Sequence, residues 1–381
     1  MLLDLDANAT YTPNESLMEL VRVAWSRLGN PSSVHRGGQR AKAAIEEARE
    51  HVRLLVGARP KDLIVFTSGA TEANNTVINS AARPGALVVS SSIEHPCILE
   101  PLRRAASQRV GLRLAQTNHL GEVKMEAVTA LVEQDTALVS VMAANNETGV
   151  VNDIATIANE TRMIAPRALI HTDGAQIIGK TLFRFDRSGV DLLTLSGHKL
   201  GALTGVGALI IREGVGLSAL FLGGSQESKL RGGTENVLGI ITLGAAAKEI
   251  YNQGPERGKA MQRARDRFEK ELMAALPDCV INGSEATRLP NTTSVYIPGI
   301  RADDLVVALD LEGIYISSGA ACSSGKPEPS HVLLAMGQSD ERVRATVRIS
   351  FRAEHGEDPL LAATTAKTIA QVVCRMRVCH D

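Results

Sequence analysis

The sequence feature that most constrains the fold is a series of short apolar runs separated by stretches of helical character. Such alternation predicts βαβ units and a mostly parallel sheet. The runs are apolar throughout rather than alternating with polar residues, so both faces of this sheet are expected to be covered. The runs are DLIVFTSG (62–69), ALVVSSS (86–92), TALVSVMAANN (136–146), ALIHTDGA (168–175), VDLLTLSGHK (190–199) and VGALIIR (206–212).

Two parts of the chain differ in pattern. The segment AKAAIEEAREHVRLLVG (41–57) has apolar residues at helical spacing and predicts a helix that stops at Gly57. After about residue 250, a polar connection leads into a long amphipathic helix, the strand TTSVYIPG, the helix DDLVVALDLEG, the strand TVRISFR and a final helix at about 358–377. We therefore predict an α/β chain with a large domain at 13–257 and a small α+β domain at 258–381 that also includes 1–12.

Composition restricts the partners. Lys and Arg number 41 against 42 Asp and Glu, and aromatic residues make up only 3% of the chain. Nearly balanced charge and few stacking side chains argue against direct binding to nucleic acid or an anionic membrane. No run of eighteen apolar residues and no signal-peptide pattern is present in the sequence, so a cytoplasmic protein is expected.

Five cysteines occur singly, at positions 97, 279, 322, 374 and 379. Their odd number favours reduced thiols over a disulfide framework. Cys374 and Cys379 lie close to His380, but no second pair completes a four-ligand zinc site, so no metal site is predicted. Cys322 differs because it lies in SSGAACSSGKPEPS (317–330), whose small residues predict a mobile loop.

Polar residues follow five of the apolar runs. Ligands gather at the carboxyl ends of parallel strands, so these residues are expected to converge on one cleft. The segments are 68–72 (SGATE), 94–95 (EH), 145–147 (NNE), 173–176 (DGAQ) and 196–199 (SGHK).

Together, three of these segments fit pyridoxal 5'-phosphate (PLP), and a fourth could add a residue that stacks on its ring. TSGATEANN (67–75) resembles a phosphate cradle at a helix N-terminus, although it also fits an ordinary strand-to-helix turn. Lys199 could form a Schiff base with the cofactor, Asp173 could keep its pyridine nitrogen protonated, and His95 could stack on its ring. Alone, S-G-H-K is more often a solvated turn, and a histidine at a strand end is more often structural.

The whole chain, from LDANAT (5–10) to the last helix, resembles the cysteine desulfurases of the NifS/IscS type. These enzymes belong to the class V branch of fold-type I PLP-dependent transferases. The resemblance rests on the order of nine motifs: NPSSVHRGGQRAKAAIEEAR, FTSGATEANN, SSSIEHPCI, ANNETGVVNDI, HTDGAQIIGK, LTLSGHKLG, GGSQESKLRGGTENV, SSGAACSSG and VRISF. It implies L-cysteine as the substrate and L-alanine as a product.

The resemblance also implies roles for individual residues. Lys199 would carry the cofactor, Asp173 would pair with the pyridine nitrogen, and His95 would stack on the ring and share proton transfer with Lys199. Gln176 and Asn146 would lie near the phenolic oxygen. The cofactor-binding residues implied are Ala70, Thr71, His95, Asn146, Asp173, Gln176, Ser196, His198, Lys199 and Thr234.

Cys322 becomes the nucleophile under this resemblance. Its thiolate would attack the substrate sulfur and retain it as a persulfide for an acceptor protein, either an iron–sulfur scaffold or another sulfur relay. Cys322 is also a candidate transient iron–sulfur ligand together with such a scaffold. Arg348 would clamp the substrate carboxylate, next to Asn146. The catalytic residues implied are Cys322, Lys199 and His95, and the other four cysteines are expected to have no role.

Thr234 is similar to a threonine that the family supplies to the phosphate of the neighbouring subunit, which implies a homodimer. The chain departs from the family pattern at LGALTGVGAL (200–209), at Tyr11 and at Arg352. Other class V PLP enzymes remain alternatives, among them a selenocysteine lyase or an aminotransferase. A non-catalytic scaffold of the same fold is a further alternative.

Overall fold

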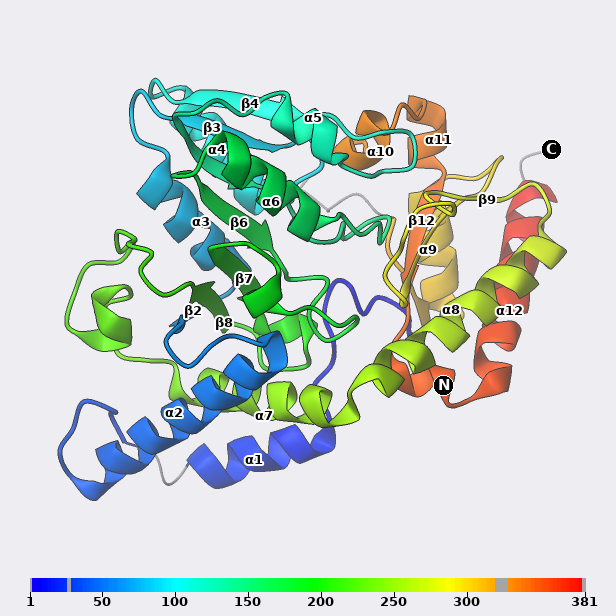
Figure 1. Ribbon diagram of the computed structural model, residues 1–381. Coiled ribbons are helices and arrows are strands. Elements are labelled where there is room, and N and C mark those ends of the chain that lie inside the picture. Colours follow the sequence, from blue (N-terminus) through cyan, green and yellow to red (C-terminus); the bar gives the residue numbers. More distant parts are fainter. Residues whose placement is uncertain (1, 26–28, 319–327, 379–381) are drawn as a thin grey trace.

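The computed structural model describes residues 2–25, 29–318 and 328–378, and its largest element is a seven-stranded sheet (Figure 1). The strand order is β2-β8-β7-β6-β5-β3-β4, and only β8 runs against the others. The strands are β2 (Leu63–Thr67), β3 (Leu87–Ser91), β4 (Gly111–Ala115), β5 (Thr136–Ser140), β6 (Leu169–Asp173), β7 (Leu192–Ser196) and β8 (Gly207–Ile211).

Six of these strands lie within the apolar runs of the sequence, which confirms the predicted α/β class. The sequence pattern missed β4. This strand lies at the edge of the sheet and is mostly half-buried, so its GLRLA segment lacks a continuous apolar run.

Helices cover both faces of the sheet, because successive strand residues point to opposite sides. Val88 and Leu138 pack with α3 and α4, whereas the next residues, Val89 and Val139, belong to a core with α2, α6 and α7. The helices of this part are α1 (Glu15–Trp25), α2 (Arg36–Val56), α3 (Ala70–Ala81), α4 (Pro96–Ala106), α5 (Met125–Thr129), α6 (Ile154–Ile164) and α7 (Val237–Gln253), with short 3₁₀ turns η1 (Phe185–Arg187), η2 (Gly197–Lys199) and η3 (Gln226–Lys229). Helix α2 ends as predicted, since Gly57 has a φ of 64° and its N–H bonds to carbonyls of the last turn.

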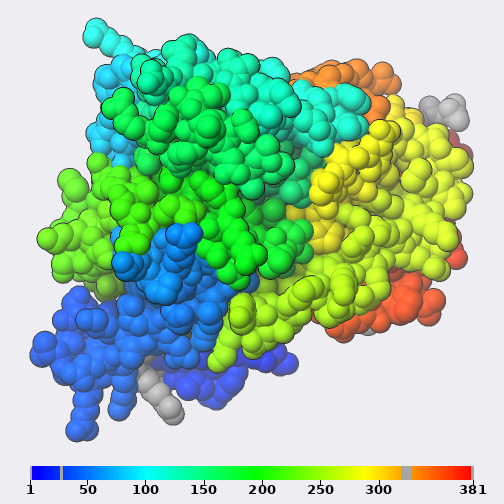
Figure 2. Space-filling model, in the orientation of Figure 1, coloured from blue at the N-terminus to red at the C-terminus, as the bar shows by residue number. Residues whose placement is uncertain are grey.

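The C-terminal part has a smaller sheet in which β10 (Thr292–Tyr296) lies between β12 (Thr346–Ser350) and β9 (Val280–Ile281). Figure 2 shows this part, in yellow to red, packed along one side of the larger part. Its helices are α8 (Pro255–Ala275), α9 (Ala302–Leu311), α10 (His331–Ala335), α11 (Asp340–Arg344) and α12 (Pro359–Val378), with a 3₁₀ turn η4 (Ala353–Gly356).

The N-terminal segment belongs structurally with this C-terminal part. Strand β1 (Leu3–Asp4) pairs with β11 (Ile314–Tyr315), and Leu5 is buried in a core with residues such as Phe268 and Ile349. Asp6 forms an isolated bridge with Ser350 on β12. Among the helices within the described ranges, none has both the length and the apolar character of a membrane span.

Candidate active site

The polar strand ends lie at one edge of the large sheet. Asp173 is the last residue of β6 and Ser196 the last residue of β7. His95 follows β3 as the N-cap of α4, and Lys199 closes the short turn η2 after β7. The parallel direction of these strands explains the convergence that the sequence predicted.

The N-terminus of α3 can receive an anion. Its N-cap is Gly69, and no side chain in the described part of the chain caps it, so the first N–H groups of the helix lack intrahelical partners. The helix begins with Ala70 and Thr71, two of the predicted phosphate ligands. A Cβ on Gly207 would lie 2.7 Å from the backbone of Gly69, so the close approach of the two backbones requires glycine at position 207.

A chain of hydrogen bonds connects Asp173 with His95. Asn74 Nδ2 donates to Asp173 Oδ2 at 2.7 Å and lies 3.1 Å from Cys97 Sγ. The Cys97 sulfur is 2.9 Å from His95 Nδ1, which also accepts the Cys97 backbone N–H at 3.2 Å. Nδ1 therefore acts as an acceptor, and the proton of the neutral imidazole is assigned to Nε2. Burial lowers the pKa of His95.

The prediction for the remaining cysteines overlooked this position of Cys97. Burial, together with the charge of Asp173, raises the pKa of its thiol to about 12. At neutral pH the thiol is protonated and a poor nucleophile. The sequence signal was its position two residues after His95, at the start of a helix.

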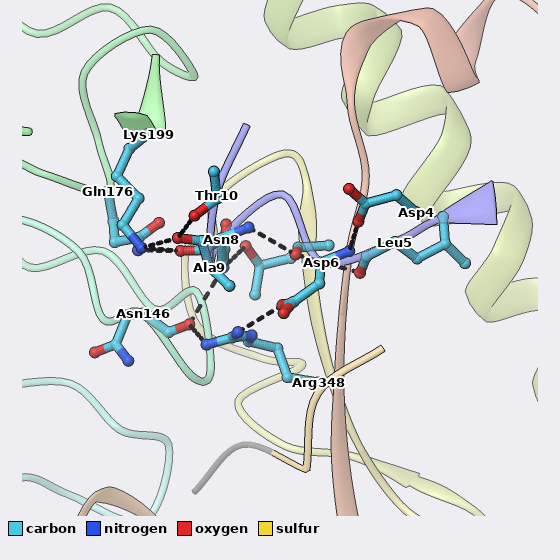
Figure 3. A network of polar contacts seen from close by, with 12 residues as sticks. Asp4, Leu5, Asp6, Asn8, Ala9, Thr10, Asn146, Gln176, Lys199 and Arg348 are labelled. Atoms are coloured by element: carbon cyan, nitrogen blue, oxygen red, sulfur yellow. Dashed lines mark hydrogen bonds and ion pairs between the residues drawn. The ribbon is translucent and has the colours of Figure 1, made fainter. Parts of the chain in front are cut away.

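Residues 6–10 cross the site between the two parts of the molecule (Figure 3). Lys199 Nζ donates to the carbonyl oxygens of Asn8 and Ala9, the latter at 2.6 Å. Burial and the nearby charge of Arg348 lower the pKa of Lys199 to about 8, against the opposing effects of Asp6 and Asp173. Lys199 is thus an amine with a substantial neutral fraction near physiological pH.

The side-chain amide of Gln176 contacts two neighbours, Asn8 and Lys180. Its Nε2 donates to the Asn8 carbonyl at 3.1 Å, and its Oε1 accepts from Lys180 Nζ at 2.6 Å. Lys180 Nζ also donates to Asn8 Oδ1 at 2.6 Å. The short spacing Gln176–Lys180 was visible in the sequence, but their meeting with Asn8 required the fold.

Arg348 on β12 faces the same segment from the opposite side (Figure 3). Its Nη2 is 2.6 Å from Asp6 Oδ1, and its Nη1 donates to the Asn146 carbonyl at 3.1 Å. The side chain is only 8% exposed, and its Nε has no partner among the described residues. This buried, unused donor fits a carboxylate ligand beside Lys199.

Cys322 lies outside the described residues, as do all of residues 319–327. Described residues on either side of that segment contact residues in or next to the site. Ser317 exchanges backbone hydrogen bonds with Arg348, and His331 contacts the carbonyl of Glu94, next to His95.

Two buried carboxyl groups, those of Glu147 and Glu94, belong to residues that contact Ser330 and His331, which follow the Cys322 segment. Glu147 accepts a hydrogen bond from Ser330 Oγ, while Glu94 accepts from Ser91 Oγ and from the Met142 N–H. Burial raises the pKa of Glu147 to about 7 and that of Glu94 to about 8. Both are therefore partly protonated near neutral pH.

Three other predicted cofactor ligands, His198, Asn146 and Thr234, make different contacts with the rest of the site. His198 Nδ1 lies 3.1 Å from Thr10 Oγ1, and burial lowers the pKa of His198 to about 4. Asn146 reaches Arg348 and Asn8 through its backbone carbonyl. Thr234 is exposed on the loop after η3, and no described contact joins it to the other site residues.

The chain resembles known proteins over nearly its whole length. The family model of class-V aminotransferases matches residues 3–358. A cysteine desulfurase of Nostoc sp. is 39% identical over 351 residues, which is 91% of this chain and 87% of the relative. Among solved structures, a NifS-like protein has a TM-score of 0.90 with 32% identity, covering 98% of this chain and 100% of its own. A structure of SspA in complex with cysteine has a TM-score of 0.81 with 29% identity, covering 93% of this chain and 99% of its own.

Proposed function

The chain belongs to the class-V aminotransferase family, and on that premise we propose that it is a PLP-dependent cysteine desulfurase. L-cysteine would be converted to L-alanine, with the sulfur retained by the protein as a persulfide. The observation that carries this proposal is the arrangement of Lys199 and Arg348 on either side of residues 6–9. Before the Cys322 segment, Ser317 is hydrogen-bonded to Arg348, and after it, His331 contacts the carbonyl of Glu94.

The described residues fit PLP. The uncapped start of α3 suits the phosphate, and the buried carboxylate of Asp173 suits a protonated pyridine nitrogen. We propose that Ala70, Thr71, Ser196 and His198 hold the phosphate, with Gln176 and Asn146 near the phenolic oxygen. Bound PLP would supply an electron sink for the electrons of the substrate Cα–H bond.

Lys199 and Arg348 would act directly on the substrate. The spare Nε and the adjacent Nη2 of Arg348 present two N–H groups on one side, a geometry that suits a carboxylate. Asp6 and the Asn146 carbonyl would hold the guanidinium in place while it binds the substrate carboxylate. Lys199, with its lowered pKa, can carry a proton at Nζ, and His95 can do so at Nε2.

Cys322 would accept the sulfur from the substrate. Its thiolate attacks the sulfur of L-cysteine, so an S–S bond forms as the substrate C–S bond breaks. The net change converts a thiol and L-cysteine into a persulfide and L-alanine. Cys97 is unsuited to this role because its thiol stays protonated.

The test compares two cysteine variants. Cys322→Ser should retain the visible absorbance of bound PLP but lose sulfide release from L-cysteine by at least about a hundredfold. Cys374→Ser, on the exposed face of α12, is the matched control and should retain the activity.

Each alternative has its own outcome in this experiment. Full activity in Cys322→Ser would exclude the persulfide mechanism, and turnover of L-selenocysteine alone would indicate a lyase. Purified protein that takes up no PLP would favour the scaffold.

We further propose that the enzyme works as a cytoplasmic homodimer in which Thr234 reaches the phosphate of the neighbouring site. Thr234 is exposed, and large apolar side chains are exposed on nearby and N-terminal segments, including Phe221, Leu222, Trp25 and Val34. The sulfur would pass to an acceptor protein, either an iron–sulfur scaffold or another relay. A molar mass measured by light scattering that matches a single chain would contradict the dimer.

A further inference from the structure

We propose that Lys180 is a positioning residue of the active site, which fixes the amide of Gln176 so that one of its N–H groups faces the cofactor. The inference rests on the proposed function, because it assigns Gln176 to the phenolic oxygen of PLP. It adds a residue that itself contacts neither cofactor nor substrate.

The contacts of Lys180 are few and directional. The residue is 5% exposed, and its amine donates at 2.6 Å to Gln176 Oε1 and at 2.6 Å to Asn8 Oδ1. Both acceptors are amide oxygens rather than carboxylates. The amine can only donate hydrogen bonds, so each amide must turn its oxygen toward Lys180. The contact therefore selects the orientation of both amides.

The consequence for Gln176 is a fixed orientation of its amide. An amide has one acceptor end and one donor end, and Lys180 occupies the acceptor end. The Nε2 end must then face the opposite side, where one N–H meets the Asn8 carbonyl at 3.1 Å and the second is available to a ligand. Without the amine, a flip of about 180° would present Oε1 to the ligand instead.

The charges around Lys180 make its burial costly. No described carboxylate forms an ion pair with it, and burial together with Lys199, Arg348 and Arg257 lowers its pKa. A methionine in its place would keep an apolar side chain of similar length and avoid this cost. The hydrogen bonds from its amine to Gln176 and Asn8 explain why a lysine occupies this position.

Lys180 also borders a cavity of about 450 Å³ between residues 178–184, the end of α7 and the start of α8. Lys259 lines the same cavity and therefore offers a matched control.

The experiment uses PLP-loaded Lys180→Met, Gln176→Glu and a control, Lys259→Met. Lys259 borders the same cavity but is exposed on α8 and pairs only with Glu256. The measured quantities are the thermal midpoint, the dissociation constant for PLP, and the pH midpoint of the absorbance change of bound PLP.

We expect Lys180→Met and Gln176→Glu both to raise the pH midpoint, by on the order of one unit, because the phenolic oxygen loses an N–H donor. PLP should also bind about tenfold more weakly in both variants, whereas Lys259→Met should match the wild type. Gln176→Glu keeps an acceptor for Lys180 but loses the N–H that meets the Asn8 carbonyl, so the pH midpoint rather than the thermal midpoint is the quantity compared between the two variants.

An unchanged pH midpoint in Lys180→Met, with only a lower thermal midpoint, would reduce Lys180 to a structural residue and overturn the inference. If that variant does not fold, a crystal structure of the loaded wild type decides: Gln176 Oε1 facing the cofactor would overturn it. A midpoint shifted by Lys180→Met in a chain without desulfurase activity would leave the positioning role standing while removing the proposed reaction. A wild-type chain that binds no PLP would overturn both.

Discussion

At the scale of single residues, the amine of Lys199 shows how the surroundings prepare a side chain for reaction. Burial and the charge of Arg348 favour the neutral form, which lowers its pKa to about 8 from the ordinary lysine value of 10.5. Only the neutral amine can add to the aldehyde of PLP. Under the proposed function, the fold itself thus favours the reactive neutral form of Lys199, without any bound cofactor.

This predicts the pH dependence of cofactor loading. The rate of PLP incorporation into the cofactor-free protein should rise about tenfold per pH unit below pH 8 and level off above it. Arg348→Met removes a nearby cation, so it should move this midpoint to higher pH. Stopped-flow absorbance measures both, with Lys199→Ala as a control that should not load. A midpoint near that of free lysine would contradict the lowered pKa.

Two residues that depart from the family pattern contact each other. The guanidinium carbons of Arg257 and Arg352 lie over the Tyr11 ring, at 4.8 and 5.3 Å from its centroid. Its hydroxyl donates to Glu354 at 2.7 Å, and burial raises the pKa of Tyr11 to about 12. The two departures therefore form one packed unit beside the site.

A double-mutant cycle tests this pairing. Tyr11→Leu and Arg352→Met should each destabilise the fold, and the double variant should lose about 1 kcal/mol less than the sum, because the cation–π contact is removed only once. Urea denaturation gives the three free energies of unfolding. Strict additivity within about 0.3 kcal/mol would show that the two residues act independently.

At the scale of elements, the turn η3 contains the most unusual backbone of the described chain. Glu227, Ser228 and Lys229 have φ values of 44°, 57° and 65°, a region unfavourable for side chains with a Cβ. Glu227 is buried and accepts hydrogen bonds from both terminal nitrogens of Arg49 and from the Phe66 N–H. These contacts hold the turn in place just before Thr234.

Glycine should relieve the strain where the side chain has no such contacts. Lys229 is exposed, so Lys229→Gly should raise the free energy of unfolding by about 0.5–1 kcal/mol, since glycine tolerates positive φ. Lys229→Ala keeps the Cβ and should give no gain. A loss of stability in the glycine variant, measured by urea denaturation, would show that the turn carries no relievable strain at this position.

At the scale of the whole molecule, Asn8 joins segments that are far apart in the sequence. It is 1% exposed, and its side chain bonds to Lys180 and Asn146 in the large part and to Asn291 and Thr292 in the C-terminal part. Its carbonyl also accepts from Lys199. One buried amide therefore connects the stability of the fold with the geometry of the site.

Removing this amide should be costly. Asn8→Ala removes the four side-chain hydrogen bonds with Asn146, Thr292, Lys180 and Asn291, so the free energy of unfolding should fall by about 2–4 kcal/mol. Asn159→Ala, on the exposed face of α6, is the control and should change it by less than about 0.5 kcal/mol. Equal losses in both variants would contradict the role of Asn8.

The sequence by itself determined the α/β class, six of the seven strands of the large sheet and the order of the polar strand ends. These features are local: an apolar run covered on both faces and a turn residue at its end are readable from neighbouring residues. The roles of Lys199, Asp173 and His95 were inferred from the strand ends and from the resemblance to a family, that of Arg348 from the resemblance alone, and all four remain proposals. The role of Cys322 rests on the sequence and on the positions of the residues that flank its segment.

Only the tertiary structure decided which side chains support those groups. The contacts of Cys97 with Asn74, of Lys180 with Asn8, and of Asn8 with both parts of the molecule have no periodic or compositional signal. Their partners lie up to 342 residues away in sequence, as for the Asn8 N–H and Ser350 Oγ. Contacts of this kind arise when separate elements pack together, and burial then makes each unpaired polar atom costly enough to fix the arrangement.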